Sequence, residues 1–345
     1  MLSRDLGIDL GTSSVLIYAK KKGIVLREPS VAVLDRRTGD ILEVGEEARK
    51  MLGRTPGGIA AIRPLKDGVI NDYEVTERML RELIRRLRGY SPVRPNVIIS
   101  VPSGITEVEE RAVVDAGMPA GARRVYLIEE ALAAALGAGL DIDRPRGCMI
   151  ADVGGGVTDI AVLSLGAVVS SGSVKAGGER FDEALIRWVR RKHNLLIGER
   201  MAEEVKIGIG CVFPRPEEKV MEVKGRCLLT GLPRTVEITS AETMEAFEEP
   251  CSTIVDGIHS VLESTPPELV ADISSSGLML SGGGCLLWGF DRMITERTGI
   301  PARIADDAVS CVAYGAGKAL ENLRHMVEGT QNFARRRQLS AESAL

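Results

Sequence analysis

The chain has 345 residues, enough for two ordinary domains and for a large core that needs no disulfide or metal. Its net charge of −4 argues against nucleic acid as a partner, and an aromatic content of 3% provides no platform for stacking bases. The six cysteines include no CxxC pair and the three histidines stand apart, so a zinc site is not expected.

The N-terminus and the apolar runs bear on localisation. Residues Met1 to Asp5 lead directly into a predicted strand and do not resemble a signal peptide. Every apolar run is shorter than the roughly 20 residues that span a bilayer. We therefore expect a cytoplasmic protein.

The first predicted elements belong to an α/β pattern. A hairpin is predicted from Leu6 to Ala19, around the turn Gly11-Thr12-Ser13-Ser14. A buried strand from Val97 to Val101 follows, and Thr106 begins a helix because Glu109, three residues on, completes a capping box. A strand from Val125 to Ile128 and a helix-forming run from Ala131 to Leu136 continue the alternation.

A second set of strands is predicted at Met149 to Ala151, Ile160 to Leu165 and Ala167 to Ser173. Its beginning, Ala151-Asp152-Val153-Gly154-Gly155-Gly156, repeats the pattern of Ile8-Asp9-Leu10-Gly11-Thr12 about 140 residues earlier. Each copy is an apolar strand that ends in Asp-x-Gly, followed by a glycine-rich turn and another strand. The repetition indicates a duplicated domain with one hairpin from each half.

These turns have a composition that suits polyphosphate. A turn of small residues can point backbone N–H groups at an anion without side chains in the way. Asp9 and Asp152 cannot bind phosphate directly, but their oxygens suit Mg²⁺, which usually keeps several waters. Two such hairpins facing each other would hold a polyphosphate from both sides.

Two further glycine clusters and a pair of carboxylates are candidate site residues. Ser281 to Gly284 follows the apolar strand Gly277 to Leu280 and could accommodate a flat adenine ring, although a plain helix-entry turn has the same composition. Gly177-Gly178 opens a helix whose N-terminal amides favour phosphate. Only one of Glu129 and Glu130 can face a site on one side of the sheet, and the strand pattern favours neither.

Several motifs occur in the order found in the superfamily of actin, heat-shock chaperones and sugar kinases. Four of them resemble its first phosphate loop, first connecting segment, second phosphate loop and adenosine loop: Ile8 to Thr12, Val101 to Thr106, Ala151 to Gly156, and Leu280 to Gly284. Ser310 to Gly317 resembles its second connecting helix. Longer strings narrow the resemblance to the MreB/Mbl family of bacterial actin homologues: Lys22 to Val31, Arg63 to Ile70, Leu196 to Arg200, and Thr265 to Leu269.

The resemblance covers residues 4 to about 323 and implies an actin-like ATPase fold of the α/β class. Two duplicated, ribonuclease-H-like domains would flank a nucleotide cleft, each with a smaller inserted subdomain. The expected first large subdomain comprises residues 1–30, 60–145 and 315–330, and the first small one 31–59. The second large subdomain comprises 146–180 and 252–314, the second small one 181–251, and a tail follows at 331–345.

The resemblance also implies ATP and Mg²⁺ as cofactors. Phosphate contacts fall on the two turns and a helix start: Gly11, Thr12, Ser13, Ser14, Gly154, Gly155, Gly156 and Gly178. Nucleoside contacts fall on a Glu-x-x-Lys element and the adenosine loop: Glu203, Glu204, Val205, Lys206, Gly282, Gly283, Gly284 and Cys285. Asp9 and Asp152 would hold the metal mainly through water, with Asp152 also catalytic. The resemblance assigns the water-orienting carboxylate to Glu130 rather than Glu129.

In function, the resemblance implies an ATPase, with slow hydrolysis linked to filament dynamics. Its partners would be further copies of the chain in homopolymer filaments, the inner face of the cytoplasmic membrane, and the cell-wall elongation machinery that keeps cells rod-shaped. Nucleic acid is not among them. Departures from the family pattern at Ser13-Ser14, Ala131, Val157 and Gly208 leave the carboxylates and glycines in place, so they bear on hydrolysis more than on binding.

Three other functions are compatible with parts of this pattern. A heat-shock-type chaperone would need a peptide-binding domain and lid, for which the roughly 28 residues after Gly317 are too few. A small-molecule kinase would need a further carboxylate base beside a substrate pocket. A binding module that has lost catalysis would keep the fold.

The membrane anchor is the feature that the sequence defines least. The five residues before the first strand are too few for an amphipathic helix. The loop from Gly89 to Pro95 offers Tyr90 and Val93 as apolar anchors, to which Met1 and Leu2 could add, although an ordinary solvent loop has the same composition.

Overall fold

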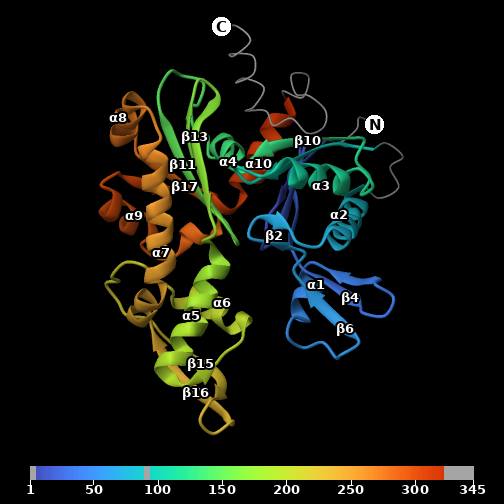
Figure 1. The fold of residues 1–345 in the computed structure, drawn as a ribbon, viewed down its shortest axis with the longest axis vertical. Coiled ribbons are helices and arrows are strands. Elements are labelled where there is room, and N and C mark those ends of the chain that lie inside the picture. The colour runs from blue at the N-terminus through green and yellow to red at the C-terminus, as the bar shows by residue number, and fades with distance from the viewer. Residues whose placement is uncertain (1–4, 89–93, 322–345) are drawn as a thin grey trace.

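The computed structural model describes residues 5–88 and 94–321. Two five-stranded sheets lie at the centres of the two halves of the molecule (Figure 1). The first has the order β10-β9-β1-β2-β3, with β1 Leu6–Leu10, β2 Ser14–Ala19, β3 Gly23–Pro29, β9 Asn96–Val101 and β10 Arg124–Glu129. The second has the order β13-β12-β11-β17-β18, with β11 Cys148–Val153, β12 Thr158–Ser164, β13 Ala167–Val174, β17 Leu278–Ser281 and β18 Ala302–Ile304.

The two sheets have the same topology. In the first, β1 pairs antiparallel with β2 and parallel with β9. In the second, β11 pairs antiparallel with β12 and parallel with β17. A third antiparallel strand and a second parallel strand complete each sheet in the same places. The matching order confirms the duplicated α/β fold that the repeated Asp-x-Gly turns predict.

The central strands are apolar because helices cover the sheets. All seven residues of β12 are buried, as expected for a strand with no solvent-exposed face. The strand predicted to end at Leu165 ends at Ser164, because Leu165 and Gly166 adopt positive φ angles of 52° and 70° in the turn to β13. The predicted start of β17 at Gly277 moves to Leu278 because Gly277 has a φ of 83°.

Two helices pack together between the sheets. They are α4 (Glu130–Gly137) and α10 (Cys311–Ala319), and their contact depends on small residues. A Cβ atom on Gly137 would lie 1.8 Å from the carbonyl oxygen of Cys311, and one on Gly315 would lie 1.7 Å from that of Ala133. These two glycines therefore set how closely the two halves approach.

The remaining helices cover the outer faces. The capping box predicted at Thr106 and Glu109 is present and begins α3 (Glu107–Gly117), which packs against α2 (Tyr73–Arg88). On the other half, α7 (Ser240–Glu263) contacts β12 and β13. In the same half, α8 (Pro267–Ser276) contacts β11 and α9 (Phe290–Thr298) contacts β18.

Each half carries a smaller sheet below its large sheet in the view of Figure 1. The first small sheet has the order β5-β4-β6, with β4 Ala32–Asp35, β5 Ile41–Val44 and β6 Ile59–Ile62, and α1 (Glu46–Lys50) packs on it. The second has the order β14-β15-β16, with β14 Leu195–Leu196, β15 Val220–Cys227 and β16 Pro233–Thr239, beside α5 (Gly178–His193) and α6 (Glu199–Ile209). Shorter elements are β7 Leu65–Lys66, β8 Val69–Ile70, η1 Gly283–Leu286 and η2 Ala308–Ser310.

The core is mainly aliphatic, with Trp188, Phe181 and Phe247 as its largest fully buried rings. Within the described ranges, every helix is too short or too polar to cross a bilayer. The tail predicted at 331–345 and most of the loop from Gly89 to Pro95 lie outside the described residues.

Candidate nucleotide site

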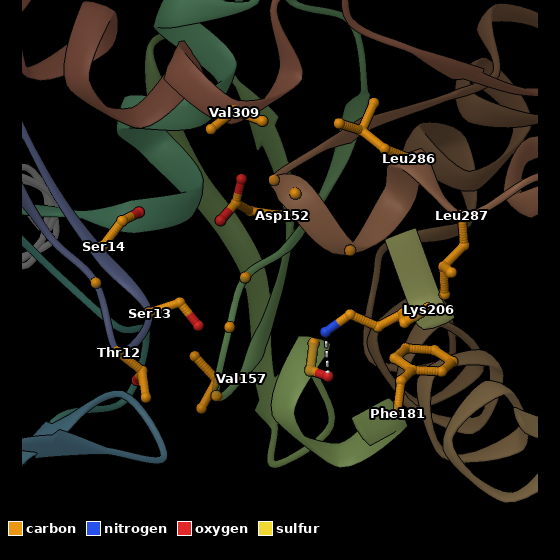
Figure 2. A pocket seen from close by; sticks show the side chains of 18 of the residues that line it. Thr12, Ser13, Ser14, Asp152, Val157, Phe181, Lys206, Leu286, Leu287 and Val309 are labelled. Carbon is orange, nitrogen blue, oxygen red and sulfur yellow. Dashed lines mark hydrogen bonds between the residues drawn. The ribbon is translucent and has the colours of Figure 1, made fainter. Parts of the chain in front are cut away.

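A cavity of about 470 Å³ lies where the two halves meet. Its lining combines both hairpin turns, the start of α5, one face of α6 and the loop after β17, and Figure 2 shows it from close by. The sequence-predicted residues that line it are Asp9, Gly11, Thr12, Ser13, Ser14, Glu130, Asp152, Gly154, Gly155, Gly156, Gly178, Glu203, Lys206, Gly282, Gly283 and Gly284. Segments that are far apart in sequence thus form one concave surface.

The first hairpin turn is fixed by one hydrogen bond within it and by others from outside it. The amide of Gly11 donates to the carbonyl oxygen of Ser14 (3.1 Å), and the Ser30 hydroxyl donates to that of Gly11 (2.6 Å). The hydroxyl oxygen of Thr12 accepts a bond from the amide of Gly68 (3.0 Å). The amides of Thr12 and Ser13 donate to no described residue. They are therefore available to an anion.

The second turn is fixed in the same manner. The amide of Gly154 donates to Val157 (2.9 Å), while the carbonyl oxygens of Gly154 and Gly155 accept bonds from the first amides of α5 (2.9 and 2.8 Å). Among the described residues, nothing accepts a bond from the amides of Gly155 and Gly156. The turn therefore uses its carbonyl groups for structure and leaves these N–H groups free.

The two turns touch each other at the floor of the cavity. A Cβ atom on Gly155 would lie 2.1 Å from the Ser13 hydroxyl oxygen, and one on Gly156 would lie 2.7 Å from that of Thr12. Any larger side chain would separate the hairpins. Glycine is required here by close approach, since neither residue has a positive φ angle.

Two aspartates stand at equivalent positions behind the turns. Asp9, at the end of β1, accepts a hydrogen bond from the Ser100 hydroxyl (3.4 Å), and Asp152, in β11, accepts one from the Ser281 hydroxyl (2.6 Å). Burial, followed by the charge of Asp152, raises the pKa of Asp9 to about 8. Burial also raises the pKa of Asp152 to about 6, against the effect of the Ser281 hydrogen bond.

Two more acids lie beside them. Burial, then the charges of Asp159, Asp9 and Asp152, raises the pKa of Glu130 well above its ordinary value. Asp159 accepts a bond from the Ser103 amide (2.9 Å), and burial raises its pKa as well. No Lys, Arg or His of the described residues forms an ion pair with these four carboxylates. Within residues 5–88 and 94–321 the cluster therefore lacks a counter-cation.

This arrangement fits a metal held largely by water. No three His, Cys, Asp or Glu side chains in residues 5–88 and 94–321 are arranged to enclose an ion. Carboxylates without a counter-cation, next to free amides that suit phosphate, match the way Mg²⁺ binds with one or two carboxylates, several waters and substrate phosphates. Asp9 and Asp152 are the residues that would hold it.

Helix α6 contributes only one face to the cavity. Glu203, Lys206 and Ile207 line it because residues three and four apart share a helix face. The Lys206 ammonium donates to the carbonyl oxygen of Gly178 (2.8 Å; dashed line in Figure 2) and to Asp182 (2.7 Å). It thereby ties α6 to the start of α5.

The structure places three predicted contacts away from the cavity. Glu204 is exposed on the other face of α6 and pairs with Arg200 (3.0 Å), and Val205 is fully buried in the core. Cys285 is also fully buried, and its thiol donates to the carbonyl oxygen of Gly282 (3.0 Å). The helical period and the turn of η1 explain these positions.

The structure also distinguishes Glu130 from Glu129. Glu130 is the first residue of α4 and lines the cavity, whereas Glu129 stands at the N-cap and does not line it. The helix therefore presents the second of the two carboxylates to the site.

Other lining residues were not predicted. They are mostly apolar: Gly68, Val157, Phe181, Ile207, Gly210, Arg215, Leu286, Leu287, Trp288, Val309 and Val312. Gly68 and Val157 lie at the hairpin turns, whereas Ile207, Leu286 and Leu287 come from α6, η1 and the segment after it. Leu286 and Leu287 lie on the opposite side of the view from Ser13 and Ser14 (Figure 2). The cavity thus has a polar end at the hairpins and an apolar end at α6 and η1, a division suited to an anionic ligand with a flat apolar part.

Comparison with known proteins identifies a single family. The profile of the MreB/Mbl protein family matches residues 3–328. The cell shape-determining protein Mbl of Bacillus cereus is 51% identical over 324 residues, which are 94% of this chain and 97% of that protein. The cell shape-determining protein MreB of Escherichia coli is 51% identical over 327 residues, 93% of this chain and 94% of that protein.

Solved structures support the same fold. MreB5 of Spiroplasma citri bound to ADP has a TM-score of 0.89 and 36% identity, covering 93% of this chain and 97% of that one. Its complex with AMPPNP has a TM-score of 0.88 and 34% identity, covering 94% and 98%. A MamK double helical filament shares the fold alone, with a TM-score of 0.79 and 21% identity over 93% and 99%.

Proposed function

The chain belongs to the MreB/Mbl family, and from that premise we propose that it binds ATP with Mg²⁺ and assembles into filaments that determine cell shape. The observation that carries the proposal is the contact between the two hairpin turns. Thr12, Ser13, Gly155 and Gly156, whose amides are free, line one cavity that both halves of the chain form. Complexes of the Spiroplasma citri relative with ADP and AMPPNP support a nucleotide as the ligand.

The division of the cavity gives the proposed orientation. Backbone amides of the two turns bind the phosphates, and Asp9 and Asp152 hold the hydrated metal beside them. Gly282 to Gly284 and the apolar residues at the other end contact the nucleoside. When bound, Mg²⁺ neutralises phosphate charge and supplies Lewis-acid polarisation.

Glu130 is the proposed group for ATP hydrolysis. It lines the cavity at the N-terminus of α4, and burial and neighbouring acids raise its pKa. A carboxylate in this position can accept a hydrogen bond from the attacking water and its proton. The first residue of a helix gives it a fixed direction, while the shared packing of α4 and α10 connects its position to both halves.

Assembly in response to nucleotide tests the proposal. Purified protein should sediment and form filaments visible by electron microscopy with ATP and Mg²⁺, and should release phosphate slowly. ADP, or omission of nucleotide, provides the control. Phosphate transfer to a small molecule without assembly would overturn the filament proposal in favour of a kinase, and assembly without turnover would indicate a binding protein that has lost catalysis.

We also propose that these filaments lie on the inner face of the cytoplasmic membrane, together with the cell-wall elongation machinery. The proposed anchors, Tyr90 and Val93 with Met1 and Leu2, lie outside the described residues. Many weak anchors on one filament would bind by avidity, so ATP should increase co-sedimentation with liposomes. The variant Tyr90→Ser/Val93→Ser should lose that gain, and undiminished lipid binding by its filaments would exclude the loop.

A further inference from the structure

The apolar end of the cavity leaves large side chains uncovered. Ile207 is 74% exposed, Leu286 is 56% exposed and Trp288 is 39% exposed, and all three line the same cavity. They come from α6, from η1 and from the segment that follows η1. Apolar side chains gathered at one end of a pocket are typical of a site that covers a flat apolar group.

Arg215 packs against one of these apolar side chains, Trp288. The Arg215 guanidinium carbon lies 4.7 Å from the centre of the Trp288 ring, within the range of a cation–π contact. The backbone holds the two residues together, because the Val212 amide donates to the carbonyl oxygen of Trp288 (3.0 Å) and Cys211 forms a β-bridge with Trp288. The side-chain stack therefore rests on a fixed backbone junction.

The guanidinium of Arg215 has unused hydrogen-bonding capacity. Its Nη1 atom is buried and has no hydrogen-bond partner in the described part of the chain. No carboxylate there forms an ion pair with Arg215, although the side chain lines the cavity. Buried charged donors are usually satisfied, so an unsatisfied one at a ligand cavity indicates that the ligand supplies the acceptor.

The position of Arg215 decides which part of the ligand it contacts. Trp288 directly follows Leu287, which lies across the pocket from Ser13 and Ser14 in Figure 2. Thr12 and Ser13, which carry free amides, are on that other side, and Asp152 lies between the two sides (Figure 2). Arg215 is therefore placed to contact the nucleobase end of the ligand and not its phosphates.

We propose that Arg215, held on Trp288, is the residue that sets nucleobase specificity. Its free guanidinium nitrogen donates to a ring nitrogen of the purine, while Ile207, Leu286 and Trp288 cover the ring. This inference rests on the proposed binding of ATP and adds to it the residue that recognises the base. Pyrimidine nucleotides, which are smaller and place their acceptors differently, bind more weakly.

The test compares nucleotides that differ by a single acceptor. Affinities of wild type and Arg215→Ala are measured by calorimetry for ATP, for its 1-deaza, 3-deaza and 7-deaza analogues, and for inorganic tripolyphosphate. A hydrogen bond to a charged group corresponds to about a tenfold to hundredfold change in affinity. Arg215→Ala should bind ATP more weakly than wild type by that factor and should bind tripolyphosphate with unchanged affinity. Wild type should bind one of the deaza analogues more weakly than ATP by the same factor, whereas Arg215→Ala should bind that analogue and ATP equally well.

Two further variants separate recognition from structural damage. Arg215→Lys keeps the charge but not the planar fork, so it should resemble Arg215→Ala. Arg144→Ala is the matched control, since Arg144 pairs with Asp141 (2.6 Å) near the start of β11, the opposite end of that strand from the site. Thermal unfolding of each variant without nucleotide shows whether it is folded.

The outcomes distinguish the two proposals. Unchanged ATP affinity in folded Arg215→Ala overturns the role of Arg215, and an equal loss for tripolyphosphate shows that it acts only as a charge. Equal losses from every deaza analogue in both proteins also overturn it. A wild-type protein that binds no ATP overturns the proposed function itself.

Discussion

The two hairpins of the cavity share a topology, but their aspartates differ in hydrogen bonding and in pKa. Asp9 and Asp152 each accept a bond from a serine on the neighbouring parallel strand. The Ser281 bond to Asp152 is 2.6 Å long, whereas the Ser100 bond to Asp9 is 3.4 Å. Burial raises the pKa of Asp152 to about 6 and that of Asp9 to about 8. At Asp9 the charge of Asp152 adds to the effect of burial, whereas the serine hydrogen bond lowers the pKa of each aspartate.

This difference shows how a duplicated scaffold acquires unequal sides. Burial raises the pKa of both aspartates, and the charge of Asp152 raises that of Asp9 further, so Asp9 keeps its proton to a higher pH than Asp152 does. In the proposed complex, the second hairpin would therefore attract the cation first, and Asp9 would lose its proton once the cation is bound.

The largest expected effect concerns the carboxylate of Glu130, which lines the cavity from the start of α4. Glu130→Gln should slow ATP hydrolysis by about 10²–10⁴-fold, the usual contribution of a positioned general base, while nucleotide affinity stays within a few-fold. Phosphate release at saturating ATP measures the rate, and calorimetry measures affinity. Glu129→Gln is the matched control one residue earlier. Slow hydrolysis in Glu129→Gln together with normal hydrolysis in Glu130→Gln would contradict this prediction and assign the catalytic role to Glu129.

The next effect tests the inequality of the aspartates directly. Asp152→Asn should lower the Mg²⁺ affinity of the ATP complex by about 10–100-fold. This is the usual loss when a residue that hydrogen-bonds to the metal's direct ligands is removed. Asp9→Asn should lower it by less than tenfold, because Asp9 has the higher pKa of the two and offers its charge less readily. Mg²⁺ titration of ATP binding gives both values. If Asp9→Asn lost as much Mg²⁺ affinity as Asp152→Asn, or more, the proposed inequality of the two aspartates would be wrong.

The smallest effect is on stability without nucleotide. An acid whose pKa is raised in the folded state contributes stability that is present below its unfolded pKa and is lost as pH rises through the folded value. For Asp9 that window runs from 3.8 to about 8. Asp9→Asn removes the penalty, so its stability relative to wild type should increase from pH 5 to pH 8, by at most about 1.4 kcal/mol for each pH unit within that window. Urea unfolding at pH 5 and pH 8 measures this, and a gain that is larger at pH 5 would contradict it.

Much of the fold follows from local sequence signals. The strands that end in Asp9 and Asp152 are short apolar runs closed by glycine turns, and their repetition predicted the duplicated sheets. The helix at Thr106 begins where its capping box predicts. These elements depend on interactions among residues close together in the chain.

The parts of the site that sequence reasoning missed depend on contacts between distant segments. Asp159 lies inside the apolar strand β12, and only the antiparallel register Asp152↔Asp159 brings it to the acidic cluster. Arg215 packs on Trp288, more than 70 residues away in the chain, because a β-bridge joins Cys211 to Trp288. The family pattern grouped Glu203, Glu204, Val205 and Lys206 as one set of contacts. The helical period could have separated Glu203 and Lys206, which share a helix face, from Glu204 and Val205.

The most direct test is a structure of the protein with AMPPNP and Mg²⁺. The account predicts that the phosphates accept hydrogen bonds from the amides of Thr12, Ser13, Gly155 and Gly156. It also predicts a hydrated metal closer to Asp152 than to Asp9, with the base between Arg215 and Gly282 to Gly284. Phosphates bound to one hairpin only, or a metal nearer Asp9, would contradict it.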